Sequence, residues 1–384
     1  MSRPARSRSR AACSERGENG GPGLSRRGLL RCVAGTSVSL GLAGCADGLS
    51  LGGDNDLPPV GTVGKAALLA PLSGPRASIG QIMAATASLG GIPIDQSAEV
   101  MVLDAGDSSA SAVAAARQAK AAGAQMILGP LFSGQSKAVA ATVGRGVPVV
   151  TLSNDSSIAG ENLFVFGVTP QQSARAVIGF AATRGKRNIT TVVPPGAFGT
   201  LSAAAARQVA GQFGVTMPAP LVAGDASGLV SRLRELNGGK LPDAVYLPVV
   251  GGPFEAQAAA LKQAGVQLLG SEQWSSIAPF RIPPLIGGWF AAPDPVRFEA
   301  FAIALEETVE AEAGIVAGLT FDAVEMARIL GRLGRQDRKG LLRDAGFDGV
   351  LGPYRFRPDG ECERGLAVLS VVEGATTLIG ASAV

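Results

Sequence analysis

Short apolar segments alternate with alanine-rich segments along most of this chain, and this alternation limits the possible folds more than any other feature. From Lys65 onward the apolar segments predict strands at 65–70, 99–104, 125–129, 147–152, 188–193, 243–248 and 267–270. The stretches between them predict helices at 109–122, 133–145, 171–184, 199–212, 226–237 and 253–264. Strands that alternate with helices in this way form parallel sheets covered by helices, so we expect an α/β fold.

The predicted strands form two successive sets, one before about residue 169 and one after it. Because these are too many strands for a single compact sheet, we expect two Rossmann-like lobes with parallel sheets, joined by a hinge. A cleft between such lobes is a common place for a small ligand. Residues 346–372 contain a Pro-Asp-Gly turn and a final apolar run, which predicts a hairpin that returns to the second lobe.

The chain has 384 residues and no histidine, and this absence excludes several classes of enzyme. Without imidazole there is no Ser-His-Asp or Cys-His nucleophile, no histidine-ligated metal and no histidine proton relay. No Gly-Lys pair is followed by Ser or Thr, and no glycine run fits a dinucleotide fingerprint. We therefore expect no catalytic residues, no metal and no cofactor.

The net charge of +3 comes from the N-terminal end. Residues 1–44 hold eight arginines and two glutamates, which leaves 26 basic and 29 acidic residues in the remainder. This remainder is slightly acidic and has no basic cluster, so we do not expect nucleic acid as a partner.

Residues 1–44 have the pattern of an export signal peptide. A twin arginine, Arg26-Arg27, precedes a short apolar stretch that is too short for a permanent membrane span. Leu42-Ala43-Gly44-Cys45 resembles a bacterial lipobox, which implies that Cys45 is lipidated and becomes the first residue. The segment around Arg26-Arg27 resembles the twin-arginine export consensus, although ordinary secretory signals also contain paired arginines. Residues 45–62, rich in Gly, Pro and Asp, are then a flexible tether to the lipid anchor.

Several segments of the folded part, taken together, resemble type I periplasmic binding proteins. They are Ala67–Pro75, Ile127–Ser133, Val147–Thr151, Asp243–Tyr246, Leu319–Ala323 and Phe347–Phe356, and they occur in the order seen in that family. The resemblance covers about residues 63–375 and is closest to the leucine-isoleucine-valine-binding branch, within it to the penicillin-binding protein activator lipoproteins. It implies a first lobe of residues 63–169 plus 289–356 and a second lobe of residues 170–288 plus 357–384.

The same resemblance implies a set of ligand-binding residues. In the amino-acid binders, hydroxyl and backbone donors of the first lobe hold the ligand carboxylate, and an acid of the second lobe holds its ammonium. Carried onto this sequence, these positions are Ser133, the loop of Ser153, Asn154 and Asp155, an aromatic wall at Phe198, and Glu272 as the ammonium partner.

Two of these positions fit the amino-acid binders poorly. Asp155 falls where those proteins place a hydroxyl, and a carboxylate there would repel the ligand carboxylate. Phe198 lacks the phenolic hydroxyl of the usual tyrosine, and Gly251-Gly252 stands where a second aromatic wall is common. The site therefore looks degraded or adapted to another use.

Each position also has a purely structural interpretation. Ser133 and Ser153 are typical helix N-caps, Asp155 is typical of an Asx-turn or cap, and Glu272 is typical of a solvated loop acid.

Three functions remain open at this point. The first is a non-catalytic extracytoplasmic lipoprotein that activates a penicillin-binding protein, regulates peptidoglycan synthesis and is anchored to the outer membrane through its lipid. The second is a substrate-binding protein that delivers an amino-acid-like or peptide ligand to an ABC transporter permease. The third is an enzyme, a carboxylate-based amidohydrolase that uses Asp155 and Glu272.

Overall fold

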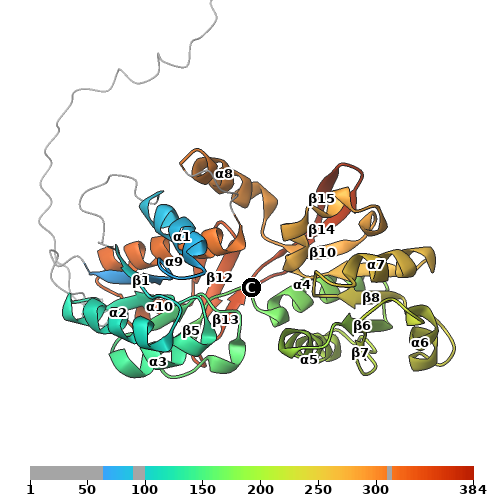
Figure 1. Ribbon diagram of the computed structural model, residues 1–384, viewed down its shortest axis with the longest axis horizontal. Helices are drawn as coiled ribbons and strands as arrows, with labels where there is room; N and C mark the ends of the chain where they lie inside the picture. Colours follow the sequence, from blue (N-terminus) through green and yellow to red (C-terminus); the bar gives the residue numbers. More distant parts are fainter. Residues whose placement is uncertain (1–63, 90–99, 309–313) are drawn as a thin grey trace, which may run out of the picture. The chain divides into compact units, whose positions relative to one another are not determined.

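The computed structural model describes residues 64–89, 100–308 and 314–384. The predicted signal peptide, Cys45 and the tether lie outside these residues. The described part of the chain contains two mainly parallel sheets, each flanked by helices, which confirms the α/β fold (Figure 1). Among these residues no helix is both long enough and apolar enough to cross a membrane.

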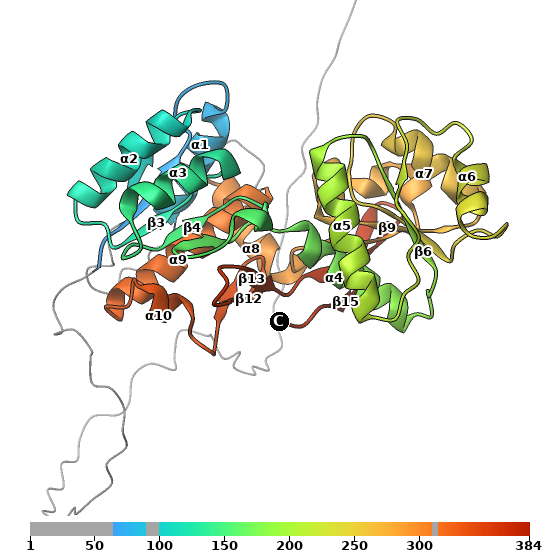
Figure 2. The ribbon, with the colours of Figure 1, turned by 90° about the horizontal axis from the view of Figure 1, so that it is seen from below.

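The first sheet has the strand order β2-β1-β3-β4-β5, and all its pairs are parallel. Its strands are β1 (Ala66–Ala70), β2 (Val100–Asp104), β3 (Met126–Leu128), β4 (Val149–Thr151) and β5 (Leu163–Val165). The helices packed on it are α1 (Ala77–Leu89), α2 (Ser109–Ala121), α3 (Ser133–Val143) and α9 (Ile315–Arg332). Figure 2 shows β3 and β4 lying between α3 and α9.

The period of two in β1 explains why helices cover both faces of this sheet. Ala66, Leu68 and Ala70 point into the cluster that contains α1 and α9, whereas Ala67 and Leu69 point into the cluster that contains α2 and α3. All five residues are fully buried, which is the pattern expected of a central parallel strand.

The second sheet has the strand order β15-β14-β10-β9-β8-β6-β7. Its strands are β6 (Ile189–Val193), β7 (Leu221–Val222), β8 (Ala244–Leu247), β9 (Gln267–Gly270), β10 (Trp289–Ala292), β14 (Ala367–Val372) and β15 (Ala375–Ala381). The helices α4 (Pro170–Thr183), α5 (Ala197–Gln212), α6 (Leu229–Leu236) and α7 (Phe254–Gln263) belong to this lobe. β14 and β15 are antiparallel, so this sheet is parallel only over its first five strands in sequence.

The remaining elements pack with the first lobe. They are the helices α8 (Pro295–Glu306) and α10 (Arg338–Leu341) and the antiparallel strands β11 (Phe347–Gly349), β12 (Gly352–Phe356) and β13 (Cys362–Arg364). Short 3₁₀ turns lie at Ser156–Ile158, Glu272–Ile277, Pro279–Arg281 and Pro283–Leu285.

Strand pairing moves two of the expected lobe boundaries. β10 pairs with β9 and β14, so residues 289–292 belong to the second sheet and not to the first lobe. β13 pairs with β12, and its Cys362 is buried in the same cluster as α9, so residues 357–364 stay with the first lobe. The hairpin expected over residues 346–372 is instead the sheet β11-β12-β13 followed by β14, and only β14 lies in the second lobe.

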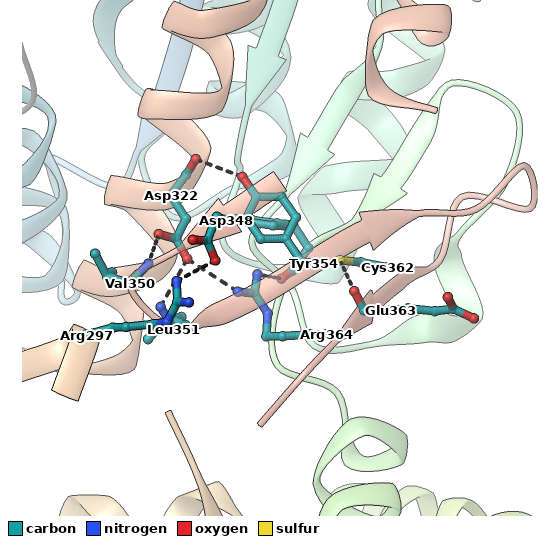
Figure 3. A network of polar contacts seen from close by, with 10 residues as sticks. Arg297, Asp322, Asp348, Val350, Leu351, Tyr354, Cys362, Glu363 and Arg364 are labelled. Atoms are coloured by element: carbon teal, nitrogen blue, oxygen red, sulfur yellow. Dashed lines mark hydrogen bonds and ion pairs between the residues drawn. The ribbon is translucent and has the colours of Figure 1, made fainter. Parts of the chain in front are cut away.

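A buried ion pair joins β13 to α9 (Figure 3). Arg364 Nη1 lies 3.3 Å from Asp322 Oδ2, and both side chains are almost completely buried. The Asp322 carboxylate also accepts the Val350 backbone N–H at 2.7 Å, while the Arg364 guanidinium lies 4.5 Å from the ring centroid of Phe166. Phe166 immediately follows β5, and Arg364 is the last residue of β13. This cluster therefore connects the segment between β5 and α4 with the segment between β13 and β14, and both lead toward the second lobe.

Candidate functional site

The carboxyl ends of the parallel strands are the first places to look for a ligand site in an α/β sheet. In the first lobe these ends carry three loops, which follow β1, β3 and β4. Asp104, the last residue of β2, holds the first loop, because its Oδ1 accepts backbone N–H groups from Leu72 at 2.9 Å and Ser73 at 3.2 Å. Hydrogen bonds, chiefly from the Ser73 side chain, lower the pKa of Asp104 and keep this carboxylate charged.

Ser133 is the first residue of α3 and is half-buried. The N-cap position belongs to Phe132 and carries no side-chain cap, so the interpretation of Ser133 as the N-cap is wrong. The Arg76 guanidinium lies 4.1 Å from the centroid of the Phe132 ring. A cation, an aromatic ring and a hydroxyl therefore lie at neighbouring positions on the loops after β1 and β3.

A close approach of two backbones fixes the loop after β3. Gly129 has a φ of 80°, and a Cβ at this position would lie 2.6 Å from the Leu69 carbonyl oxygen of β1. Only glycine fits this conformation and this space.

The loop after β4 is held by hydroxyl groups. Thr151 Oγ1 donates to the Pro130 carbonyl at 2.8 Å and accepts the Ser153 backbone N–H at 3.2 Å. Ser153 is buried, and its Oγ accepts the Asp155 backbone N–H at 3.2 Å. Ser153 therefore supports the turn and does not cap a helix.

Asp155 caps the 3₁₀ turn that follows it. Its Oδ1 accepts the backbone N–H of Ser157 at 3.1 Å and the hydroxyl of the same residue at 2.6 Å. The interpretation of Asp155 as a cap is thus confirmed. Asn154, between Ser153 and Asp155, is exposed.

In the second lobe the corresponding loops follow β6, β8 and β9. Phe198 is half-buried in the first turn of α5, directly after the β6 loop. Gly251 and Gly252 follow β8 and are exposed. As glycines, Gly251 and Gly252 present no side chain to this edge of the sheet.

Glu272 opens the 3₁₀ turn after β9 and is buried, with 6% of its surface exposed. Its carboxylate accepts a hydrogen bond from the Ser173 hydroxyl of α4. Burial raises the pKa of Glu272 to about 7, against the opposing effect of this hydrogen bond. The interpretation of Glu272 as a solvated loop acid is therefore wrong.

Tyr246 of β8 belongs to the same buried region and was not predicted from the sequence. Its phenol is completely buried without a hydrogen-bond partner in the described part of the chain. Burial and the nearby charge of Glu272 raise its pKa well above the usual value. Only tertiary packing reveals this residue, because in the sequence it is one of several apolar positions in a buried strand.

The structure does not join Asp155 and Glu272 into one catalytic pair. Each bonds to its own neighbour, Ser157 in one case and Ser173 in the other. Within the described residues there is also no group of three or more Cys, Asp or Glu side chains that could hold a metal ion. The arrangement therefore offers binding groups at the ends of the strands.

Comparison with known proteins agrees with this geometry. The family model for periplasmic binding proteins matches residues 64–376. The chain belongs to the periplasmic binding protein family. A search of curated protein sequences finds no match.

Many solved structures have a similar fold. One is a putative branched-chain amino acid ABC transporter protein from Rhodospirillum rubrum, with a TM-score of 0.65 and 21% identity over 83% of this chain and 100% of that one. Another is full-length LpoA from Haemophilus influenzae, with a TM-score of 0.67 and 17% identity over 83% of this chain and 59% of LpoA.

The C-domain of LpoA, described as a regulator of PBP1A, has a TM-score of 0.65 and 19% identity over 82% of this chain and 99% of that domain. At these identities the likeness concerns the fold, and transporter-associated and regulatory relatives match it equally well.

Proposed function

We propose that this protein is a non-catalytic, lipid-anchored regulator of peptidoglycan synthesis that binds and activates a penicillin-binding protein. The observation that carries this proposal is Asp155. The resemblance to amino-acid binders places a ligand carboxylate beside this position, where the fold presents a second carboxylate that is fixed on Ser157. Two carboxylates in a desolvated cleft repel each other, so the first lobe is poorly suited to an amino-acid ligand.

Two further features agree with a protein partner. The exposed Gly251 and Gly252 provide no wall against a ligand side chain. The LpoA C-domain, with the same fold, is described as a regulator of PBP1A. The signal peptide and lipidation at Cys45 would place the protein in the periplasm, and we propose an outer-membrane anchor from which it reaches a synthase.

The test is to add soluble protein, residues 46–384, to purified penicillin-binding proteins of the same cell. We expect direct binding, and a faster rate of glycan polymerisation or of peptide cross-linking. Binding to none of these proteins, together with unchanged rates of both reactions, would contradict the proposal.

A second function, that of an ABC-transporter substrate-binding protein, is favoured by Glu272. Its buried carboxyl, with a pKa of about 7 and an unpartnered phenol nearby, is the kind of group that binding sites use for a cationic ligand. In that case a panel of amino acids would stabilise the protein, by about 2.7 kcal/mol at 100 times the dissociation constant. The variant Ser133→Ala would weaken this stabilisation. The soluble protein would then leave the reaction rates of the penicillin-binding proteins unchanged.

A further inference from the structure

A pocket lies where α4 meets β13 and the segment before it, and it borders the loop after β4 through Ser156. It is lined by Thr169, Gln172 and Arg175 of the α4 end and by Arg357, Glu361 and Arg364, and its empty space is about 610 Å³ including the open mouth. None of Ser133, Ser153, Asn154, Asp155, Phe198 and Glu272 lines it.

Two backbone donors at the start of α4, the N–H groups of Thr169 and Gln172, are already used. The Thr169 hydroxyl accepts the Gln172 backbone N–H, and the Gln172 carbonyl oxygen Oε1 accepts the Thr169 N–H at 3.1 Å. Gln172 Nε2 in turn donates to the Cys362 carbonyl at 2.5 Å. The charged side chains of the lining are the strongest groups it offers for recognition.

Most of the charges around the pocket are paired. Glu363 Oε2 lies 2.7 Å from Arg355 Nη2, and Arg357 Nη2 lies 2.9 Å from Asp359 Oδ2. Arg364 is paired with Asp322, which was described above. One donor of this last guanidinium is left over, because Arg364 Nε is buried and has no partner among the described residues.

Two charged side chains of the lining remain after this pairing, Arg175 and Glu361. Arg175 is exposed and Glu361 is half-buried, and in the described part of the chain neither side chain takes part in an ion pair or a side-chain hydrogen bond. Burial, and after it the charge of Asp359, raises the pKa of Glu361 against the opposing charge of Arg357, so this carboxyl gains from a further cationic partner. One unpaired cation and one unpaired carboxyl thus line the same pocket.

We propose that this pocket is a second ligand site and that it takes a small zwitterion, a free amino acid or a short peptide. The ligand carboxylate binds Arg175 and accepts from Arg364 Nε, and the ligand ammonium binds Glu361. The site contacts the start of α4 and the segment before β13 together, so an occupant connects two chain segments that link the lobes.

The experiment measures binding of the twenty standard amino acids and of L-alanyl-L-alanine to residues 46–384 by calorimetry. We expect at least one of them to bind, and the comparison of alanine with its dipeptide separates an amino-acid site from a peptide site. The N-acetyl and C-amide derivatives of the best ligand each lack one charge, so each should bind at least about tenfold more weakly. Failure of every probe to bind would overturn the proposal.

Substitutions then identify the pocket. Arg175→Gln and Glu361→Gln should each weaken binding by at least about tenfold, whereas Arg175→Lys, which keeps the charge, should retain most of it. Arg117→Gln on α2 and Glu255→Gln on α7 are matched controls, because both residues are exposed and lie outside the pocket. Both should bind like the wild type.

The predicted cleft residues provide the opposite control. The variant Ser133→Ala changes a residue of α3 that does not line this pocket, and it should retain binding. If binding is lost in Ser133→Ala but unchanged in Arg175→Gln and Glu361→Gln, the ligand occupies the strand ends and the proposal is wrong. Neither result depends on whether a penicillin-binding protein is the partner.

Discussion

The buried Glu272 should make the stability of the second lobe depend on pH. Burial raises the pKa of this carboxyl from an ordinary 4.5 to about 7 in the folded chain. Between about pH 4.5 and pH 7 the Glu272 carboxyl keeps its proton in the folded chain, whereas it has released this proton in the unfolded chain. The free energy of unfolding therefore falls as pH rises from about 4.5 to about 7, and it stays low at higher pH.

The magnitude follows from the same two values. A difference of one in pKa corresponds to about 1.4 kcal/mol, so the full effect is about 3 kcal/mol. In Glu272→Gln the amide keeps the shape and remains uncharged, so this dependence disappears. We expect the variant to match the wild type near pH 4.5 and to be more stable by about 3 kcal/mol at pH 8.

Tryptophan fluorescence during urea unfolding is a suitable assay. Both tryptophans of the chain, Trp274 and Trp289, lie in the second lobe, and Trp274 is two residues from Glu272. All other ionisable groups are common to both proteins and cancel in the difference. Glu255→Gln, an exposed acid on α7, is the control and should leave the pH profile unchanged.

The reasoning would be refuted if the difference between Glu272→Gln and the wild type were constant from pH 4.5 to pH 8. A second variant tests the cause. The Ser173 hydroxyl opposes the rise in pKa, so Ser173→Ala should move the transition of the profile to higher pH. A shift to lower pH would show that this hydrogen bond does not favour the charged form.

Three other predictions follow from the packing. Arg364→Met leaves Asp322 buried without its partner, so it should lower the free energy of unfolding by about 3–5 kcal/mol. Chemical denaturation measures this loss, and a loss below about 1 kcal/mol would contradict a structural role for the ion pair. Gly129→Ala forces a side chain into a positive-φ position against a strand carbonyl, so it should lower the free energy of unfolding by about 1–3 kcal/mol or more. Gly134→Ala is the control and should be nearly neutral, because the space around Gly134 is open. Equal melting temperatures for the two variants would count against the close approach. Burial raises the pKa of the Cys362 thiol to about 12. At pH 8 the native protein should therefore resist alkylation by iodoacetamide and react only after denaturation. Rapid labelling of the native protein would show that the thiol is accessible.

The sequence by itself determined the fold class and most of the parallel sheets. The strands predicted at 65–70, 99–104 and 243–248 differ from β1, β2 and β8 by at most one residue at each end. The segments of β1 and β8 are buried on both faces, and this apolar pattern leaves few alternatives to a central parallel strand, whereas β2 is a partly buried edge strand. Chain order also predicted the division into two lobes.

Some elements escaped prediction because their local pattern is weak. α1 was not predicted, and its Gly80 is a poor helix former that packs against the Pro71 carbonyl. The boundaries at 289 and 357 were wrong, because the partners of β10 and β13 are separated from them along the chain and pairing is a tertiary property.

The state of the predicted binding residues was decided only by the tertiary structure. From sequence, Glu272 is a loop acid after a strand, and only the folded chain shows that it is buried and accepts a hydrogen bond from Ser173, which lies 99 positions earlier. The ion pair of Arg364 with Asp322, and the lack of such a pair for Arg175 and Glu361 among the described residues, likewise depend on which segments the fold brings together. The local sequence pattern indicates which face of a strand or helix is buried. The charge state and the partners of a side chain depend on residues that are distant in sequence, so only the folded chain defines these two properties.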